Sequence, residues 1–415
     1  MKKRKRTMNI ILMDHYAGSP AMGMEFRPYY MAREWVKKGH NVRIVGGDFS
    51  HLRIKNPKIR KDFTTQTIDG IKYTWLRTGE YEGNGVKRAE SMMRYVGKLY
   101  INAERIARAW KPDVVIASST YPLETYAAKK IAKCAGAKYI HEVHDMWPAT
   151  LYEIGGMSKK HPFVVMMQAA ENSAYKNCDE LVALLPYTKK YMVKHGLAPY
   201  KFHNIQNGIL SQEWADKQPL PDEHTQLFEK LKDKFIVLYM GGHALSNALD
   251  ILLDCAAQEK DSDIAFVLVG DGVEKPRLVK RKNDEKLDNV YFLPPVPKTM
   301  VPSLVEKADC SYMGALDSPL YRFGLCLNKM YDCMMAGKPI VCAINAPKTL
   351  VEQYDCGFMA DPSDVETINS AVHKLKNMTK AQRDEMGQRG KTAVLDNFTY
   401  EKLAQRFLDI MEKNK

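Results

Sequence analysis

The chain has 415 residues, of which 45% are hydrophobic and 27% are charged. This composition excludes a disordered protein, and the length exceeds what one hydrophobic core normally serves, so we expect two α/β domains. No run of about 18 apolar residues occurs, and the apolar run after the basic residues 2–6 is short. We therefore expect neither a transmembrane helix nor a signal peptide. The eight cysteines form no C-x-x-C pair, which is typical of reduced thiols in a cytoplasmic protein.

The net charge of +13 is distributed unevenly along the chain. Residues 1–200 hold 34 Lys and Arg against 18 Asp and Glu, a net charge of +16, whereas residues 201–415 have a net charge of −3. The first half is therefore predicted to face an anionic partner. The candidates are a phospholipid surface, a lipid pyrophosphate and nucleic acid. The alternative is that these charges are scattered and only keep the protein soluble.

Strands and helices alternate along the first half of the chain, which predicts parallel βαβ units. Strands are predicted at residues 9–13, 42–45, 71–76, 113–117, 138–143 and 180–184, and helices at about 24–38 and 123–134. Residues 88–110 form a basic amphipathic segment, which is expected either to lie on a membrane surface or to pack into the core. Its apolar stripe consists of Met92, Val96, Leu99, Ala103, Ile106 and Trp110.

The same alternation restarts after residue 208, so a second doubly wound domain is expected. Its strands are predicted at residues 235–240, 264–269, 290–293, 310–313 and 339–342, and its first helix at 246–258. Residues 212–229 are expected to be a connector. We predict a first domain over residues 1–207, a second over 208–395, and a C-terminal segment, 396–415, whose helix packs back on the first domain.

Two polar clusters follow predicted strands of the first domain, where ligands of doubly wound folds bind. In the loop of residues 15–23, Gly18 and Gly23 let the backbone approach an anion, and Arg27 is expected to reach a phosphate or an acceptor, or to be a surface residue. His15 is expected to orient a substrate.

The second cluster, residues 141–148, offers His144 and Asp145 for acid/base chemistry or for contacts with hydroxyl groups. Its H-x-x-H spacing predicts no metal site, because residues three apart on a strand point to opposite faces.

Three glycine-containing turns of the second domain are predicted to bind phosphate groups. The first offers Gly242, His243 and Asn247, and the second offers Gly270 and Gly272. The third leads into a short helix and offers Arg322, Lys329 and Asp332. A cation near a helix N-terminus, as Lys329 is, opposes the helix dipole but suits a phosphate site; the alternative is a surface ion pair between Lys329 and Asp332. The D-x-D sequence at 261–263 precedes its strand and is expected to be a solvated turn.

The order and spacing of these segments resemble the bacterial family 4 glycosyltransferases. The likeness extends from about residue 8 to 413 and includes HYAGSP, PDVVIASS, EVHDMWP, IQNGI, YMGGHALSNALD, LVGDG and NKMYDCMMAGKPIV. Within the family it is greatest for the branch that transfers N-acetylated amino sugars in O-antigen or capsule assembly. The resemblance implies a GT-B fold, with two Rossmann-like domains facing across a cleft, and retaining, metal-independent sugar transfer. It implies a nucleotide-sugar donor, expected to be a UDP-sugar, and no other cofactor.

Two positions depart from the pattern of this family. In its E-x7-E motif the second carboxylate binds ribose, and Asp332 matches that position, whereas the first position falls on Gly324. The Arg/Lys pair that usually holds the diphosphate is replaced by the turn with Gly242, His243 and Asn247, so Lys329 with Arg322 is expected to supply the positive charge. We expect backbone N–H groups of residues 242, 243 and 272 to stabilise the leaving diphosphate.

The implied acceptor is a saccharide linked to a polyprenyl diphosphate at the inner face of the cell membrane, which agrees with the basic first half. The expected location is cytoplasmic and peripheral to that membrane. A sugar-nucleotide 2-epimerase of similar architecture is the alternative enzyme, and it would not need a basic first domain. A non-enzymatic protein that binds an anionic surface is the third alternative; nucleic acid is not the expected partner, because no binding motif for it occurs.

Overall fold

The structure is a computed structural model that describes residues 6–23, 26–83 and 85–413. The chain divides into two compact units. The first comprises Met1–Gln206 together with Tyr400–Lys415, and the second comprises Asn207–Thr399. These boundaries lie within a few residues of those expected from the sequence.

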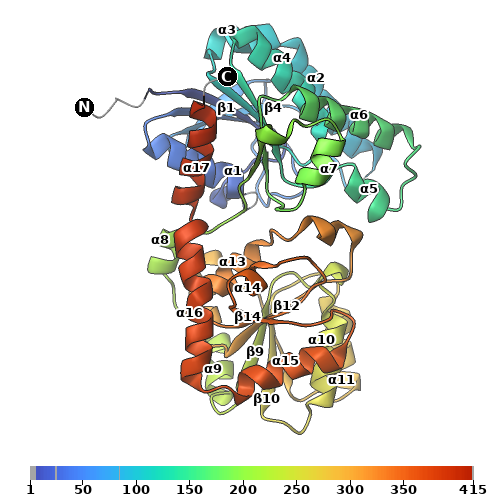
Figure 1. The fold of residues 1–415 in the computed structure, drawn as a ribbon, viewed down its shortest axis with the longest axis vertical. Coiled ribbons are helices and arrows are strands. Elements are labelled where there is room, and N and C mark those ends of the chain that lie inside the picture. Colours follow the sequence, from blue (N-terminus) through green and yellow to red (C-terminus); the bar gives the residue numbers. More distant parts are fainter. Residues whose placement is uncertain (1–5, 24–25, 84, 414–415) are drawn as a thin grey trace. The chain divides into compact units, whose positions relative to one another are not determined.

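The first unit is built on an eight-stranded sheet in the order β3-β4-β2-β1-β5-β6-β7-β8 (Figure 1). All neighbouring strands are parallel except β3, which runs antiparallel to β4. The strands β1, β5 and β6 are almost wholly buried, as expected for parallel strands covered by helices on both faces. The strands are β1 (Asn9–Met13), β2 (Asn41–Gly47), β3 (Thr64–Ile68), β4 (Ile71–Leu76), β5 (Val114–Ala117), β6 (Lys138–Val143), β7 (Glu180–Ala183) and β8 (Phe202–Asn204).

The C-terminal helix belongs to the first unit, where it packs against the first helix (Figure 1). The indole N–H of Trp35 donates to the carbonyl of Ala404 at 3.1 Å, and its ring lies 5.2 Å from that of Phe407. The expected return of the C-terminal segment to the first domain is therefore found. The helices of this unit are α1 (Phe26–Lys37), α2 (Val86–Ile101), α3 (Ala103–Trp110), α4 (Thr125–Ala135), α5 (Ala149–Glu153), α6 (Pro162–Asn177), α7 (Lys189–Lys194) and α17 (Tyr400–Glu412). The start of the first expected helix, at residues 24–25, lies outside the described residues.

The basic amphipathic segment differs from the expected single helix. It breaks at Asn102 into α2 and α3, and Met92, Leu99 and Ile106 are at most 2% exposed. The stripe therefore packs into the core, so it is not a face on which the protein lies on a membrane. Among the described residues, no helix combines the length and the apolar character needed to cross a bilayer.

The second unit holds a six-stranded parallel sheet in the order β11-β10-β9-β12-β13-β14. Its strands are β9 (Phe235–Met240), β10 (Ile264–Val269), β11 (Val290–Leu293), β12 (Cys310–Gly314), β13 (Ile340–Ala343) and β14 (Gly357–Met359). Its helices are α8 (Ser211–Ala215), α9 (Asp222–Lys230), α10 (Leu249–Gln258), α11 (Lys275–Asp284), α12 (Val301–Val305), α13 (Asn328–Met335), α14 (Leu350–Gln353), α15 (Val365–Asn377) and α16 (Lys380–Asn397). The expected connector at 212–229 is mostly helical, because Phe228 anchors α9 in the core.

Candidate functional site

A cavity of 370 Å³ lies in the second unit where β9, β10 and β11 end. This is the edge at which open parallel sheets bind ligands, and the volume is within the range of small-molecule pockets, which begins at about 300 Å³. One wall is apolar and the other carries a cation and two carboxylates. The lining residues are Met240, Gly241, Gly242, Val269, Gly270, Asp271, Pro295, Val296, Val301, Leu304, Lys329 and Asp332.

The cation of this cavity is Lys329, in the first turn of α13. Its ammonium donates to Asn247 Oδ1 at 3.0 Å and lies 4.9 Å from the centre of the Tyr239 ring. Burial lowers the pKa of Lys329, and no carboxylate is within ion-pair distance of it in the part of the chain that the structure describes. The expected alternative, a surface pair with Asp332, is therefore not formed.

Asp332 is 6% exposed and pairs with Lys298, whose ammonium lies 2.5 Å from each carboxylate oxygen. Lys298 lies in a short 3-10 turn, Lys298–Met300, that follows the loop after β11. Sequence reasoning did not find Lys298, because no local pattern relates it to a residue 34 positions away. The pair holds the Asp332 carboxylate at the cavity wall.

The two glycine turns are less open to an anion than expected. The His243 N–H donates to the Asp271 carbonyl at 2.7 Å, and the Gly272 N–H donates to the Asp271 side chain at 2.8 Å. A Cβ atom on Gly270 would lie 1.9 Å from the Gly241 carbonyl oxygen, so that glycine is required because the turns touch each other. The expectation that residues 243 and 272 offer free N–H groups is wrong for this arrangement.

Of the three residues whose backbone N–H groups were expected to bind the diphosphate, Gly242 has the N–H that remains available. Its N–H makes no hydrogen bond within the described ranges, and the residue is exposed. Its carbonyl accepts from the Tyr239 hydroxyl at 2.7 Å and from Asn247 Nδ2 at 2.9 Å. Asn247 thus links the Gly242 backbone to Lys329 and fixes the position of both.

His243 and Arg322 lie away from the cavity lining. The His243 ring is fully buried near Tyr239 and Phe292, where burial lowers its pKa to about 4, so it is neutral and contributes no cation. The Arg322 guanidinium lies 4.2 Å from the Phe323 ring and donates to the Pro319 carbonyl in its own 3-10 turn. Lys329 is therefore the lining cation, and Gly324 places no carboxylate at the first position of the motif.

In the first unit, Arg27 forms an internal ion pair instead of a surface or phosphate site. It is 4% exposed, and its Nη2 lies 2.9 Å from Glu142 Oε1. The same guanidinium donates to the carbonyls of Ile205 and Gln206 at 2.9 and 2.7 Å. Burial is the largest single influence on Glu142 and opposes its ionisation, but the Arg27 charge together with the bonds from His144 and Ser118 lowers the pKa of that carboxyl well below its ordinary value. Both expected roles of Arg27 are therefore corrected.

Glu142 also positions His144, just beyond the end of β6. His144 Nε2 lies 2.9 Å from Ser118 Oγ and 3.1 Å from Glu142 Oε2, while the Ser118 hydroxyl donates to the same carboxylate oxygen. An Nε2–H that donates to this pair leaves Nδ1 as a hydrogen-bond acceptor or base. Asp145 Oδ1 accepts from the Met146 N–H at 2.8 Å, and its Oδ2 has no partner among the described residues.

His15 has a structural position. It is fully buried between the rings of Tyr16 and Tyr95, at centroid distances of 4.6 and 4.7 Å, and its Nδ1 lies 2.9 Å from the Tyr121 hydroxyl. Burial and two arginine charges lower its pKa well below the ordinary value. His15 therefore holds its loop, and the expectation of direct substrate contact is not supported by this arrangement.

The glycines of the same loop also serve its shape. The Gly18 carbonyl accepts from the Tyr73 hydroxyl at 2.8 Å, and Gly23, at φ +79°, ends a 3-10 turn against Ile54. The helix start that was expected to bind an anion falls at residues 24–25, outside the described residues.

A second buried carboxylate, Glu124, was not found from the sequence. Its oxygens accept from the Ser119 N–H at 2.7 Å and from the Ser119 hydroxyl, while the His15 N–H donates to that hydroxyl at 2.8 Å. Burial raises the pKa of Glu124 to about 8, although the bonds from Ser119 act against the rise. Glu124 therefore joins the loops after β1 and β5 through its bonds with Ser119.

Neither histidine of the H-x-x-H sequence is part of a metal cluster. His141 is buried in β6, where burial lowers its pKa to about 4, and His144 bonds to Glu142 and Ser118. Among the residues that the structure describes, no group of three or more His, Cys, Asp or Glu is arranged to hold a metal ion.

Comparisons with known proteins agree with this geometry. Residues 22–212 match the family described as Glycosyltransferase Family 4, and residues 222–393 match that described as Glycosyl transferases group 1. The chain is 24% identical to WcaI of Escherichia coli (strain K12), which is assigned as a glycosyl transferase of colanic acid biosynthesis. That match covers 51% of this chain and 54% of WcaI, so it spans about half the length of the relative.

Two solved structures are similar over almost the whole chain. HepE of Anabaena, in complex with UDP and glucose, has a TM-score of 0.65 at 15% identity and covers 98% of this chain and 100% of its own. Sucrose-phosphate synthase from Thermosynechococcus elongatus has a TM-score of 0.72 at 15% identity, with 97% of each chain covered. Both likenesses concern the fold, which consists of two parallel-sheet α/β domains. With the two family matches spanning most of its length, the chain belongs to the family 4 glycosyltransferases and has the GT-B fold.

Proposed function

We propose that the protein transfers a sugar, of the 2-acetamido class, from a UDP-linked donor to a saccharide carried on a polyprenyl diphosphate. The observation that carries this proposal is the 370 Å³ cavity of the second unit, which combines an apolar wall, an ammonium that pairs with no carboxylate among the described residues, and a fixed carboxylate. A nucleoside diphosphate has these three chemical parts, namely a flat base, a dianionic diphosphate and a ribose diol. The complex of HepE with UDP and glucose supports uridine as the nucleoside.

Each part of the donor has a matching group in the cavity. The base fits the apolar wall of Pro295, Val296 and Leu304, and the ribose hydroxyls donate to Asp332. The diphosphate accepts from the Lys329 ammonium and from the Gly242 N–H, which makes no hydrogen bond among the described residues. Because Lys329 is partly desolvated and has no counter-ion in the part of the chain that the structure describes, its interaction with an anion is stronger than it would be in water.

The transfer step needs charge stabilisation at the leaving diphosphate. The acceptor hydroxyl oxygen bonds to the anomeric carbon while the bond from that carbon to the diphosphate oxygen breaks, with retention of configuration. The hydroxyl proton passes to a leaving phosphate oxygen, and Lys329 stabilises the negative charge that develops there. Because this ammonium supplies the cation, we expect donor binding to be independent of magnesium.

His144 and Asp145 are proposed to orient the reacting sugar or the acceptor. Both follow β6 at the carboxyl edge of the first sheet, and each keeps an acceptor atom, Nδ1 or Oδ2, that is unused within the described residues. Glu142, Ser118 and Arg27 act behind them as positioning residues. The net charge of +16 in residues 1–200 supports a lipid-linked, anionic acceptor and a peripheral location at the inner membrane face.

A thermal-shift panel tests the donor site. We would compare UDP, GDP, ADP and dTDP, with and without magnesium, on the native protein and on Lys329→Ala, Asp332→Ala and the control Lys230→Ala, which removes an exposed charge from α9. A ligand at about 100 times its dissociation constant stabilises the fold by about 2.7 kcal/mol. We expect a shift with UDP alone that persists in the control and is lost in both site variants. No shift with any nucleotide would reject this donor site.

A further inference from the structure

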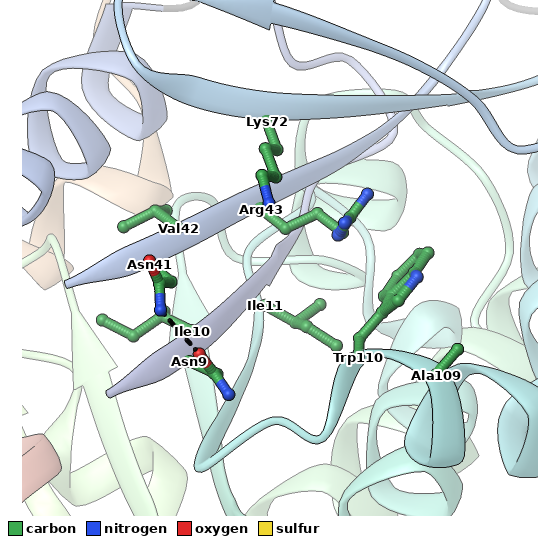
Figure 2. Close-up of a pocket in the computed structure, with 9 residues that line it drawn as sticks. All are labelled: Asn9, Ile10, Ile11, Asn41, Val42, Arg43, Lys72, Ala109 and Trp110. Atoms are coloured by element: carbon green, nitrogen blue, oxygen red, sulfur yellow. Dashed lines mark hydrogen bonds between the residues drawn. The ribbon is translucent and has the colours of Figure 1, made fainter. Parts of the chain in front are cut away.

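The first unit has a second hollow, of 220 Å³, at the edge of the sheet where the strands begin. It is formed by the starts of β1, β2 and β4 together with the end of α3, and its residues are shown in Figure 2. Within the first unit this edge is opposite to that of His144 and Asp145, which follow the end of β6. The hollow is therefore separate from the residues proposed to orient the reacting sugar.

Arg43 is the central residue of this hollow. It interrupts the apolar strand β2, is half-buried, and its guanidinium carbon lies 4.3 Å from the centre of the Trp110 ring. Its Nη1 donates to Thr74 Oγ1 at 2.7 Å and to Thr65 Oγ1 at 3.3 Å. Its Nε and Nη2 make no hydrogen bond within the described residues. In general, these two atoms form the edge of a guanidinium that can donate two parallel hydrogen bonds to a phosphate.

Lys72 adds a second cation beside Arg43. The two residues are register partners on β4 and β2, so their side chains leave the same face of the sheet. Among the described residues, no carboxylate lies within ion-pair distance of either of them. A partly desolvated cation without a counter-ion is unfavourable unless an anion joins it, and burial lowers the pKa of Arg43.

The surroundings of this hollow are also basic. A second hollow beside it shares Asn9 and is lined by Arg6, Arg108, Lys111 and Asp113. Arg6 pairs with Asp113 at 2.7 Å and Arg108 with Glu104 at 3.7 Å, so Lys111 is its cation without such a partner among the described residues. The Asn41 amide donates to Asn9 Oδ1 at 3.0 Å and keeps the rim of the groove in place. Lys111, which pairs with no carboxylate among the described residues, therefore adds positive charge on the other side of Asn9.

We propose that this 220 Å³ hollow, with Arg43, Lys72 and Trp110, is a groove that binds a phosphate group, and that it is separate from the proposed donor cavity. The Arg43 edge receives two phosphate oxygens, the Lys72 ammonium neutralises the remaining charge, and the Trp110 ring holds the guanidinium plane in position. The volume of 220 Å³ is below the range of about 300–1,000 Å³ for whole small-molecule pockets, so the groove suits a phosphate and not a complete nucleotide. The phosphate belongs either to a lipid headgroup or to a soluble phosphate compound.

Two titrations distinguish these sources and test the site. In the first, inorganic phosphate and pyrophosphate are titrated against the full chain while tryptophan fluorescence and binding heat are followed. In the second, the protein is sedimented with phosphatidylcholine vesicles that contain or lack phosphatidylglycerol. The test variant is Arg43→Gln/Lys72→Gln, and the matched control is Lys190→Gln/Lys194→Gln, which removes the same charge from two exposed residues of α7. The thermal unfolding of each variant verifies that it is folded.

We expect saturable binding in at least one titration, weakened about tenfold or more in the test variant and within about twofold of native in the control. Binding to free phosphate would identify a soluble ligand, and binding only to vesicles with phosphatidylglycerol would identify a headgroup. Trp110→Phe should abolish the fluorescence change. The proposal is overturned if neither titration saturates, or if the test and control variants lose affinity equally, because the binding would then depend on net charge alone. Donor binding by UDP should persist in both variants, so this inference fails or succeeds independently of the proposed transfer.

Discussion

Replacing Lys329 by methionine should affect nucleotide affinity and stability very differently. Methionine matches the length of the lysine stem and fills the same space without the charge. A hydrogen bond from a charged donor contributes about 1.5–3 kcal/mol, so the loss of this ammonium should weaken UDP binding by about tenfold to 150-fold. Isothermal titration calorimetry with UDP measures this loss directly.

The free energy of unfolding should change little in the same variant. Lys329→Met removes the bond to Asn247 and the contact with the Tyr239 ring, each of which contributes about 1 kcal/mol. It also removes the unfavourable burial of an ammonium that no carboxylate of the described ranges neutralises, so we expect a net change within about 1 kcal/mol in urea unfolding. Lys230→Met is the control and should change neither quantity. A Lys329→Met protein that binds UDP within twofold of native would refute the placement of the diphosphate.

Three other experiments test separate features of the structure. Gly270→Ala should destabilise the fold by about 3 kcal/mol in urea unfolding, because the new Cβ would overlap the Gly241 carbonyl oxygen. The control Gly242→Ala, whose Cβ would have its nearest neighbour at 4.0 Å, should change the free energy of unfolding by no more than about 1 kcal/mol. Equal effects of the two substitutions would contradict the contact between the turns. Arg27→Met should lower the free energy of unfolding by about 3–5 kcal/mol, because it leaves Glu142 charged and buried without its partner. Adding Glu142→Gln should recover part of that stability. If it recovers none, loss of the ion pair is not the cause of the destabilisation. Asp332→Asn should remove the preference for UDP over its 2′,3′-dideoxy analogue, which we expect to be about tenfold or more in the native protein; a retained preference would place the ribose elsewhere.

The titration of Lys329 gives a pH dependence with a defined sign. Its pKa is lower in the folded chain than in the unfolded one, so between these two values the unfolded chain binds more protons. The contribution of this group to stability therefore increases as pH rises through that window toward 10.5, whereas UDP affinity falls as the ammonium is lost. Lys329→Met should abolish both trends. If the two profiles move in the same direction in the native protein, Lys329 is not the group that binds the diphosphate.

The sequence predicted the long buried strands and failed at short or polar ones. The strands from β9 to β13 are continuous apolar runs between turn residues, so their ends were found within a residue or two. The strand β3 was missed because Thr64–Ile68 is polar and forms an edge that pairs antiparallel with β4. The break at Asn102 was missed because the apolar stripe continues in register from α2 to α3.

The proposed donor site was predictable from the sequence where its residues lie on one helix, because their spacing along the chain places them on the same side. Lys329 and Asp332 lie in α13 and both line the cavity. By contrast, the partners of Arg27, Asp332 and Arg43 come from other elements, and a single sequence does not reveal which charges meet. The roles of Arg27 and His15 were misjudged for that reason, since Glu142 and two tyrosine rings enclose them.

The groups around each buried cation indicate whether that cation has a structural role or a ligand-binding role. Arg27 is buried against Glu142 and two backbone carbonyls, so its charge is satisfied internally and its removal should chiefly lower stability. Lys329 and Arg43 are partly desolvated, each lies over an aromatic ring, and neither pairs with a carboxylate among the described residues. Such a cation is costly to the empty protein and is stabilised when an anion binds. Neutral replacement of Lys329 or Arg43 should therefore reduce ligand affinity with little change in unfolding free energy, the opposite of the outcome for Arg27. If all three replacements destabilise the fold equally, an absent counter-ion does not mark a binding site in this protein.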